Sequence, residues 1–277
     1  MLPDQADNLR RLVSRNVSSD QPPRGRLTVL TGCKGGVGVT TLSLNIAVAI
    51  RSQASRVLVV DCNPQRGDLA SIYRVKGEYD IGDVISRRCA VTEAISLGPA
   101  GVQLIPRFGI SEVVSAASCW QLLRQLEAVT HAFDHIIIDA GCCASAAEVL
   151  WPAADDAIVV MTTDQVAITD GYALVKTMQA RNVLGNVSFI VNRFQDETRA
   201  IDIQQRLEQS CQQFLGLEVK SIGRVPFADH WETAVSEARS VICARPASFA
   251  SSAIYDIARG LASGDVATND LNSVVAS

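Results

Sequence analysis

The sequence predicts an α/β fold in which a mainly parallel, doubly wound sheet carries helices on both faces. Short, almost purely apolar runs alternate along the chain with longer segments that suit helices, a pattern typical of parallel sheets covered on both sides. Hydrophobic residues make up 48% of the 277 residues and charged residues 19%, which allows a sizeable core. A glycine-rich turn follows the first apolar run, and a helix-like segment begins directly after it.

Seven apolar runs give the expected strands. They cover residues 27–30, 57–60, 102–105, 136–138, 158–161, 187–191 and 219–225. Helix-compatible segments lie at residues 40–50, 119–129, 168–180, 201–214 and 249–261. Ligands of such folds bind at the carboxyl ends of the strands, so we expect the functional residues directly after these runs.

The chain divides into one large domain and two terminal segments. Residues 26–263 are expected to form the domain, because this length suits a single α/β unit. Residues 1–25 combine a short helical stripe, from Leu9 to Val13, with a linker of serine, proline and glycine. Residues 264–277 are small, polar and acidic, and a loose tail is expected there.

Charge and cysteine usage narrow the class of protein. The net charge is −4, whereas proteins that coat DNA usually present a basic surface, so nucleic acid is not expected as a partner. The eight cysteines form no C-x-x-C pair, and the three histidines have no metal-ligand spacing. The N-terminus carries no apolar signal region, and no apolar run approaches the ~20 residues of a membrane span. We therefore expect a reduced, cytoplasmic, soluble protein.

The glycine-rich turn has the features of a phosphate-binding loop. The segment from Thr31 to Thr41 reads T-G-C-K-G-G-V-G-V-T-T, between an expected strand and an expected helix. Such a turn lets backbone N–H groups converge on a phosphate, and the helix N-terminus adds partial positive charge. The residues assigned to the nucleotide are Gly35, Gly36, Val37, Gly38, Val39, Thr40 and Thr41.

Two aspartates follow buried runs at positions suited to magnesium. Asp61 comes directly after residues 57–60, and Asp139 directly after residues 136–138. Carboxylate and hydroxyl oxygens are ligands that Mg²⁺ accepts. We therefore assign the metal site to Thr40, Asp61 and Asp139.

The loop resembles the deviant Walker A motif of the MinD/ParA family, K-G-G-V-G-K-T-T. The resemblance implies a P-loop NTPase fold, ATP and Mg²⁺ as ligands, and a homodimer formed on ATP. It also implies that Lys34 is the signature lysine, which in the family reaches the phosphates of the partner subunit. Two positions depart from the motif: Val39 replaces the second lysine, and Cys33 replaces the preceding glycine.

The two switch segments resemble those of the same family but also depart from it. Asp61-Cys62-Asn63 resembles a D-x-D segment whose second aspartate orients the attacking water, so an amide replaces a carboxylate. General-base catalysis typically increases the rate of a reaction ~10²–10⁴-fold. In the second switch, which begins at Asp139, Cys143 stands where the family has a glycine. The residues assigned to catalysis are Lys34, Asp61, Asn63 and Asp139, with hydrolysis that is weak or depends on a partner.

Three stretches resemble one branch of the family, the FlhG/FleN regulators of flagellar number. Residues 4–10 read D-Q-A-D-N-L-R, like the D-Q-A-x-x-L-R segment that activates the GTPase FlhF in that group. Residues 168–176 resemble its I-T-D-A-Y-A-L-I-K stretch, and residues 213–226 resemble a further run. The resemblance implies an FlhF-like partner bound through residues 4–13, and recruitment to a cell pole or flagellar base.

The same resemblance places four residues around the adenine. Asn192 and Arg193 take the position of the family's N-R pair beside the base. Pro226 and Phe227 would lie on the other side of the base. A strand-end turn residue is the alternative interpretation of Asn192.

Other functions stay open at this point. P-loops without the second lysine occur in the TadZ/CpaE relatives, which makes a non-hydrolytic nucleotide-binding scaffold for polar pilus assembly the alternative. The negative net charge of the chain disfavours a DNA-partition ATPase. The last helical segment, residues 249–261, carries a single base, Arg259, so a basic membrane-binding helix is not expected there.

Overall fold

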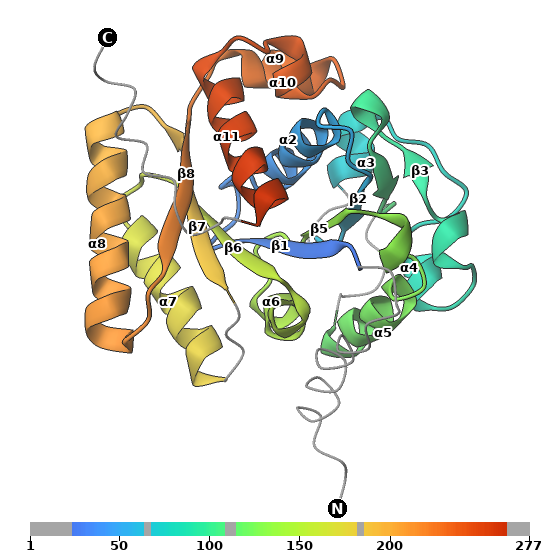
Figure 1. Ribbon diagram of the computed structural model, residues 1–277, viewed down its shortest axis with the longest axis horizontal. Helices are drawn as coiled ribbons and strands as arrows, with labels where there is room; N and C mark the ends of the chain where they lie inside the picture. The colour runs from blue at the N-terminus through green and yellow to red at the C-terminus, as the bar shows by residue number, and fades with distance from the viewer. Residues whose placement is uncertain (1–23, 64–67, 109–114, 182–185, 265–277) are drawn as a thin grey trace, which may run out of the picture.

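The computed structural model describes residues 24–63, 68–108, 115–181 and 186–264. Within these ranges an eight-stranded sheet has the order β3-β4-β2-β5-β1-β6-β7-β8, and all pairings are parallel except that of β3 with β4 (Figure 1). The strands are β1 (Arg26–Gly32), β2 (Val57–Asp61), β3 (Ser96–Leu97), β4 (Gln103–Ile105), β5 (His135–Asp139), β6 (Asp156–Met161), β7 (Val187–Phe194) and β8 (Lys220–Pro226). The predicted fold class is confirmed.

Helices cover both faces of the sheet and enclose two apolar clusters. One cluster packs beneath α4, α5, α6, α7 and α8, and the other beneath α2, α3, α10 and α11. The helices are α2 (Val39–Arg51), α3 (Asp68–Tyr73), α4 (Ile81–Ile85), α5 (Ala116–Leu126), α6 (Ala144–Leu150), α7 (Ala167–Ala180), α8 (Glu197–Leu215), α9 (His230–Ser236), α10 (Val241–Ala244) and α11 (Phe249–Ser263). Single 3₁₀ turns are η2 (Val91–Glu93), η3 (Pro99–Gly101), η4 (Thr130–Ala132) and η5 (Trp151–Ala153).

The central strands form because their residues suit a sheet that is buried on both faces. Every residue of β2, β5 and β6 is buried, so successive side chains meet apolar neighbours on alternate sides. Local capping fixes where two predicted helices start. Ser115 accepts a hydrogen bond from the N–H of Ser118 (3.1 Å), and α5 therefore begins three residues before the apolar stripe at Cys119. Asp196 caps α8 in the same way, through the N–H of Arg199.

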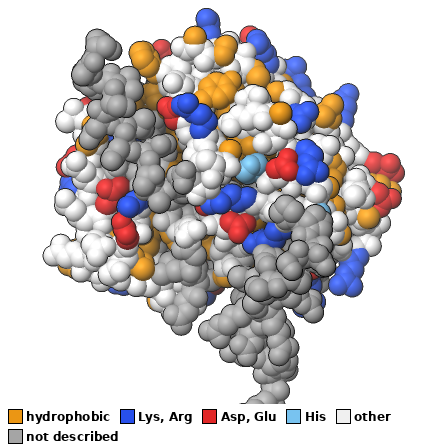
Figure 2. Space-filling model, in the orientation of Figure 1, with side chains coloured by type: hydrophobic (Ala, Val, Ile, Leu, Met, Phe, Trp, Pro, Cys, Tyr) orange, Lys and Arg blue, Asp and Glu red, His pale blue; other side chains and the backbone are white. Residues whose placement is uncertain are grey.

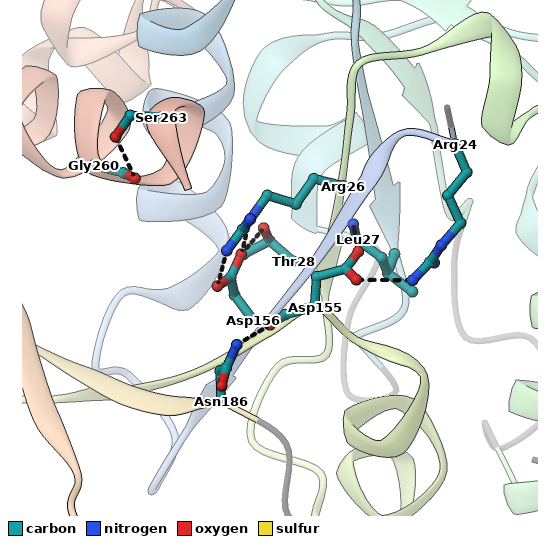
Figure 3. Close-up of polar contacts among 9 residues, drawn as sticks. All are labelled: Arg24, Arg26, Leu27, Thr28, Asp155, Asp156, Asn186, Gly260 and Ser263. Atoms are coloured by element: carbon teal, nitrogen blue, oxygen red, sulfur yellow. Dashed lines mark hydrogen bonds and ion pairs between the residues drawn. The ribbon is translucent and has the colours of Figure 1, made fainter. Parts of the chain in front are cut away.

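A cluster of ion pairs joins β1 to β6 at the amino ends of these strands, opposite the phosphate loop (Figure 3). The guanidinium of Arg26 donates to both carboxylate oxygens of the fully buried Asp156, at 2.5 and 2.7 Å. Arg24 donates to Asp155 at 2.8 Å, and Asp155 also accepts from the N–H of Leu27 (2.8 Å). These contacts hold the first strand of the domain in place. The predicted partner segment, residues 4–13, and the predicted tail after Gly264 lie outside the described residues.

Loss of the Arg26 guanidinium should destabilise the domain strongly. Arg26→Met leaves the carboxylate of Asp156 buried without its partner, and breaking such a pair typically costs about 3–5 kcal/mol. Urea unfolding monitored by circular dichroism measures the free energy of unfolding. The matched control is Arg56→Met, which removes an ion pair with Asp134 whose side chains are 57% and 43% exposed and should cost less than about 1 kcal/mol. Equal losses for the two variants would contradict this account.

Candidate nucleotide-binding site

The loop between β1 and α2 has a backbone that requires glycine. Gly36 and Gly38 have φ of +81° and +91°, a conformation that residues with a Cβ rarely adopt, and Gly38 is the N-cap of α2. A Cβ on Gly38 would also lie 2.7 Å from the amide nitrogen of Asn192. Backbone conformation therefore requires glycine at positions 36 and 38, and the close approach of Asn192 requires it at position 38 as well.

A cavity of about 200 Å³ lies against this loop and collects residues from distant parts of the chain. Asn63 comes from the end of β2, Ile72 from α3, and Gly141 and Cys142 from the segment after β5. The loop supplies Lys34, Gly35, Gly36, Val37, Gly38, Val39, Thr40 and Thr41. The predicted phosphate-binding residues and Asn63 thus line one cavity at the carboxyl edge of the sheet, where ligands of such folds bind.

Asp61 and Asp139 end neighbouring strands and are paired in register. Both are fully buried. Asp61 accepts hydrogen bonds from the N–H groups of Asn63 (3.1 Å) and Leu69 (3.2 Å), and the N–H of Gly141 donates to Asp139 (2.9 Å). Burial raises the pKa of Asp61 well above its usual value, and the charge of Asp139 raises it further.

Asp61 and Asp139 have the ligand chemistry of a magnesium site, although of the predicted set only Thr40 lines the cavity itself. Two buried carboxylates side by side repel each other, and a bound dication would offset that repulsion. Thr40, in the first turn of α2, supplies the hydroxyl of the predicted set. A metal held there would neutralise phosphate charge.

Two of the four departures from the family's motifs, Val39 and Asn63, line this cavity, whereas Cys33 and Cys143 do not. Val39 is 6% exposed and presents methyl groups where the family has an ammonium group. Asn63 packs tightly against Gly141, since a Cβ on that glycine would lie 2.5 Å from the amide oxygen of Asn63. Gly141 has φ +59°, so the two predicted switch segments touch at a position that only glycine fits.

Lys34 is held by a carboxylate of its own subunit. Its ammonium group lies 2.5 Å from a carboxylate oxygen of Asp164, and the hydroxyl of Thr162 donates to the same carboxylate oxygen. The hydrogen bond that its ammonium group donates to Asp164 raises the pKa of Lys34. Burial alone would raise the pKa of Asp164, but hydrogen bonds from Lys34 and Thr162 outweigh burial and lower it.

Two of the four predicted adenine-side residues, Asn192 and Arg193, contact the phosphate loop directly, whereas Pro226 ends β8 and Phe227 follows it. The side-chain amide of the fully buried Asn192 donates to the carbonyl of Val37 (2.8 Å), and Arg193 donates to the carbonyl of Gly36 (3.2 Å). The guanidinium of Arg193 lies 5.7 Å from the ring centre of Phe227, a cation–π contact. Among the described residues, the buried amide oxygen of Asn192 has no hydrogen-bond partner.

Comparison with known families decides the class. Residues 25–187, more than half of the chain, match the family described as AAA domain. The chain belongs to this family of P-loop ATPases. The antiactivator FleN of Pseudomonas aeruginosa is 25% identical over 248 residues, which are 88% of this chain and 89% of FleN. The flagellum site-determining protein YlxH of Helicobacter pylori is 29% identical over 174 residues, 61% of this chain and 59% of YlxH.

The solved structures agree on the fold. The chain superposes on the MinC:MinD cell division protein complex of Aquifex aeolicus with a TM-score of 0.71 at 23% identity, covering 86% of this chain and 95% of the other. This P-loop ATPase is therefore of the MinD/ParA type, close to FleN, as the motifs predicted. None of the helices in the described ranges is long and apolar enough to cross a membrane.

Two contacts of this ATPase were missed from the sequence. Asp164 follows the strand β6 by three residues, the kind of signal that pointed to Asp61 and Asp139, and it could have been found. The indole of Trp151 donates to the hydroxyl of Thr31 (3.1 Å), which links the helix after the second switch to the start of the phosphate loop. No local pattern marks that second contact, because 120 residues separate its partners.

Proposed function

We propose that the chain is an ATP-binding switch that closes into a homodimer on nucleotide. The observation that carries the proposal is that the glycine loop and Lys34 line one cavity at the edge of the sheet where β2 and β5 end in Asp61 and Asp139. The loop would bind the phosphates and Thr40, Asp61 and Asp139 the Mg²⁺. Asn192 and Arg193, which resemble the family's N-R pair beside the base and contact the phosphate loop, support adenine as the base.

Hydrolysis by this switch is proposed to be weak or to require a partner. Val39 supplies no charged donor to the transferred phosphate, and Asn63 cannot accept a proton as a carboxylate does. Backbone N–H groups and the metal still hold the phosphates, so binding should suffer less than turnover.

We further propose that the switch regulates the number or placement of flagella. FleN and YlxH, to which the chain is similar, are an antiactivator and a flagellum site-determining protein. The D-Q-A-D-N-L-R segment at residues 4–10 supports an FlhF-like GTPase as the partner. In this scheme residues 1–25 bind the partner, residues 26–263 bind nucleotide, and residues 264–277 form a tail. The dimer would be recruited to a cell pole or flagellar base.

DNA and membrane are not proposed as partners. On the face shown in Figure 2, acidic side chains are interspersed among the basic ones. The described part of the last helix, α11, carries Arg259 beside Asp256, with which it forms an ion pair. Neither feature resembles the basic surface that anionic partners require.

A non-hydrolytic scaffold for polar pilus assembly is the second candidate. The buried Val39 favours it, since that residue removes the cation most directly tied to hydrolysis. Measuring ATP hydrolysis by this chain and GTP hydrolysis by an FlhF-like GTPase, each alone and together, separates the two functions. With a scaffold, neither protein would stimulate hydrolysis by the other.

The partner segment is tested by deleting residues 1–16. The variant should bind ATP like the full chain and should no longer stimulate the GTPase. Loss of ATP binding instead would mean that the segment belongs to the nucleotide domain and would contradict the proposed division of the chain.

Asp164→Asn should make the dimer form at lower ATP concentration. Lys34 has to leave Asp164 before it can reach a partner's phosphates, and the amide removes the charge that holds it. Because the pair is about one-third exposed, a shift of about two- to five-fold is expected, as for exposed ion pairs. Analytical ultracentrifugation over an ATP series gives the midpoint. Glu218→Gln is the control, since it removes an exposed pair with Lys220 away from the site. An unchanged or higher midpoint for Asp164→Asn would contradict the release of Lys34.

A further inference from the structure

The end of β7 carries a bulge beside the phosphate loop. Asn192 pairs with Val225 of β8 and Phe194 with Pro226, so Arg193 is the extra residue of the bulge. Arg193 also has φ +59°, a left-handed conformation that residues with a Cβ rarely adopt. Bulges and strained residues of this kind are frequent next to functional sites, where they redirect a side chain. Here the side chain of Arg193 reaches the phosphate loop.

Asn192 and Arg193 hold two consecutive carbonyl groups of that loop. The guanidinium of Arg193 donates to the carbonyl of Gly36 (3.2 Å), and the buried amide of Asn192 donates to the carbonyl of Val37 (2.8 Å). Each planar peptide unit joins a carbonyl to the N–H of the next residue, so these two bonds also fix the N–H groups of Val37 and Gly38. The glycines at positions 36 and 38 have few steric restrictions, so the loop needs such contacts to keep one conformation.

Further contacts hold the two donors themselves. The guanidinium of Arg193 lies 5.7 Å from the ring centre of Phe227, and the N–H of Phe227 donates to the carbonyl of Phe194 (2.7 Å). Asn192 is confined by close packing, because a Cβ on Gly38 would lie 2.7 Å from its amide nitrogen. The end of β7 and the segment after β8 therefore support the loop together.

We propose that Asn192 and Arg193 are positioning residues that brace the phosphate loop and act on phosphate binding through its backbone, not only on the base. The brace keeps the N–H groups of Val37 and Gly38 in one orientation. It also joins the loop to Phe227, on the predicted adenine side of the site. Its action on phosphate binding rests on the proposed function, whereas its action on the loop backbone does not.

The action on the loop is tested by ¹⁵N relaxation of the nucleotide-free full chain. The N–H groups of Val37 and Gly38 should have order parameters near ~0.85 in the wild type and should fall to about 0.6 or below in the variants. Arg193→Met replaces the guanidinium by an uncharged side chain, and Asn192→Ala removes the buried donor. Order parameters that stay at the wild-type value in both variants would overturn the brace.

Arg87→Met is the matched control for Arg193→Met. Arg87 has the same φ of +59° and is also exposed, but it lies after α4. This variant should leave the order parameters of the phosphate loop unchanged. A loop that loosens equally in Arg87→Met would mean that the effect is general destabilisation and would overturn the brace. Because Arg193 is exposed, Arg193→Met tests the proposal even if Asn192→Ala does not fold.

The action on phosphate binding is tested by calorimetric titration with inorganic tripolyphosphate and Mg²⁺, because this probe has phosphates but no base. Arg193→Met should weaken its binding about threefold and Asn192→Ala about tenfold, the range for the loss of one hydrogen bond. Arg193→Lys keeps a charged donor and should stay within about twofold of the wild type.

Titration with ATP separates the brace from a contact with the base. If both variants bind tripolyphosphate like the wild type but bind ATP more weakly, Asn192 and Arg193 act on the base alone, and the role in phosphate binding is overturned. If the wild type binds neither probe, the proposed nucleotide site is refuted, and the order parameters still decide whether the brace holds the loop.

Discussion

Returning the two missing charges, with Val39→Lys and Asn63→Asp in one chain, should raise ATP turnover at least about 100-fold. The carboxylate at position 63 would orient and deprotonate the attacking water, which is typically worth ~10²–10⁴-fold. The ammonium at position 39 would stabilise charge that develops on the transferred phosphate. Both positions line the cavity beside the loop. Phosphate release at saturating Mg²⁺ and ATP measures the gain.

Single variants and an apolar control make that result specific. Val39→Lys and Asn63→Asp alone should each give a smaller gain, because base and donor act on the same transition state. Val39→Met enlarges the side chain without adding charge and should leave turnover near the wild-type rate. If the double variant binds ATP but hydrolyses it no faster than the wild type, the presence of Val39 and Asn63 does not explain slow hydrolysis.

Lys34→Ala should abolish the ATP-dependent dimer and leave ATP binding by the monomer largely intact. Lys34 lines the cavity at the outer end of the loop, where its ammonium pairs with the exposed part of Asp164. The backbone N–H groups that would cradle the phosphates do not depend on this side chain. Sedimentation velocity with and without ATP gives the dimer fraction, and equilibrium dialysis gives the affinity.

Lys220→Ala is the control for Lys34→Ala, because it removes an exposed lysine at the start of β8. It should dimerise like the wild type. An ATP-dependent dimer that survives Lys34→Ala would contradict the role given to this lysine. A loss of ATP binding together with the dimer would instead make Lys34 a ligand of its own subunit's nucleotide.

The central strands β2, β5 and β6 could be predicted because all of their residues are buried and most are apolar. The runs that predicted β2 and β5 stop one residue short of each observed end, since Asp61 and Asp139 are polar but still pair in the ladder. The edge strand β3 has two residues and carries no periodic signal. Short helices such as α4 and α10 were missed for the same reason: four or five residues hold too little pattern, and their caps decide where they form.

The candidate site could be predicted where its residues are adjacent in sequence, and less where distant segments meet. The loop from Lys34 to Thr41 is a local motif, and the cavity confirms that its residues lie together. The contact of Asn192 with Val37 joins residues 155 positions apart, and only the family resemblance indicated that Asn192 was near the nucleotide.

The central claim, a site built to bind ATP more readily than to hydrolyse it, is tested most directly by one paired measurement. Calorimetric titration of the full chain with Mg²⁺ and ATP, and with GTP for comparison, is followed by phosphate release from the same samples. We predict saturable binding of ATP, weaker binding of GTP, and turnover at or below about 10⁻² per second, the range of switch proteins without an activating partner. Turnover well above that rate by the isolated protein, or no binding of ATP, would contradict the account.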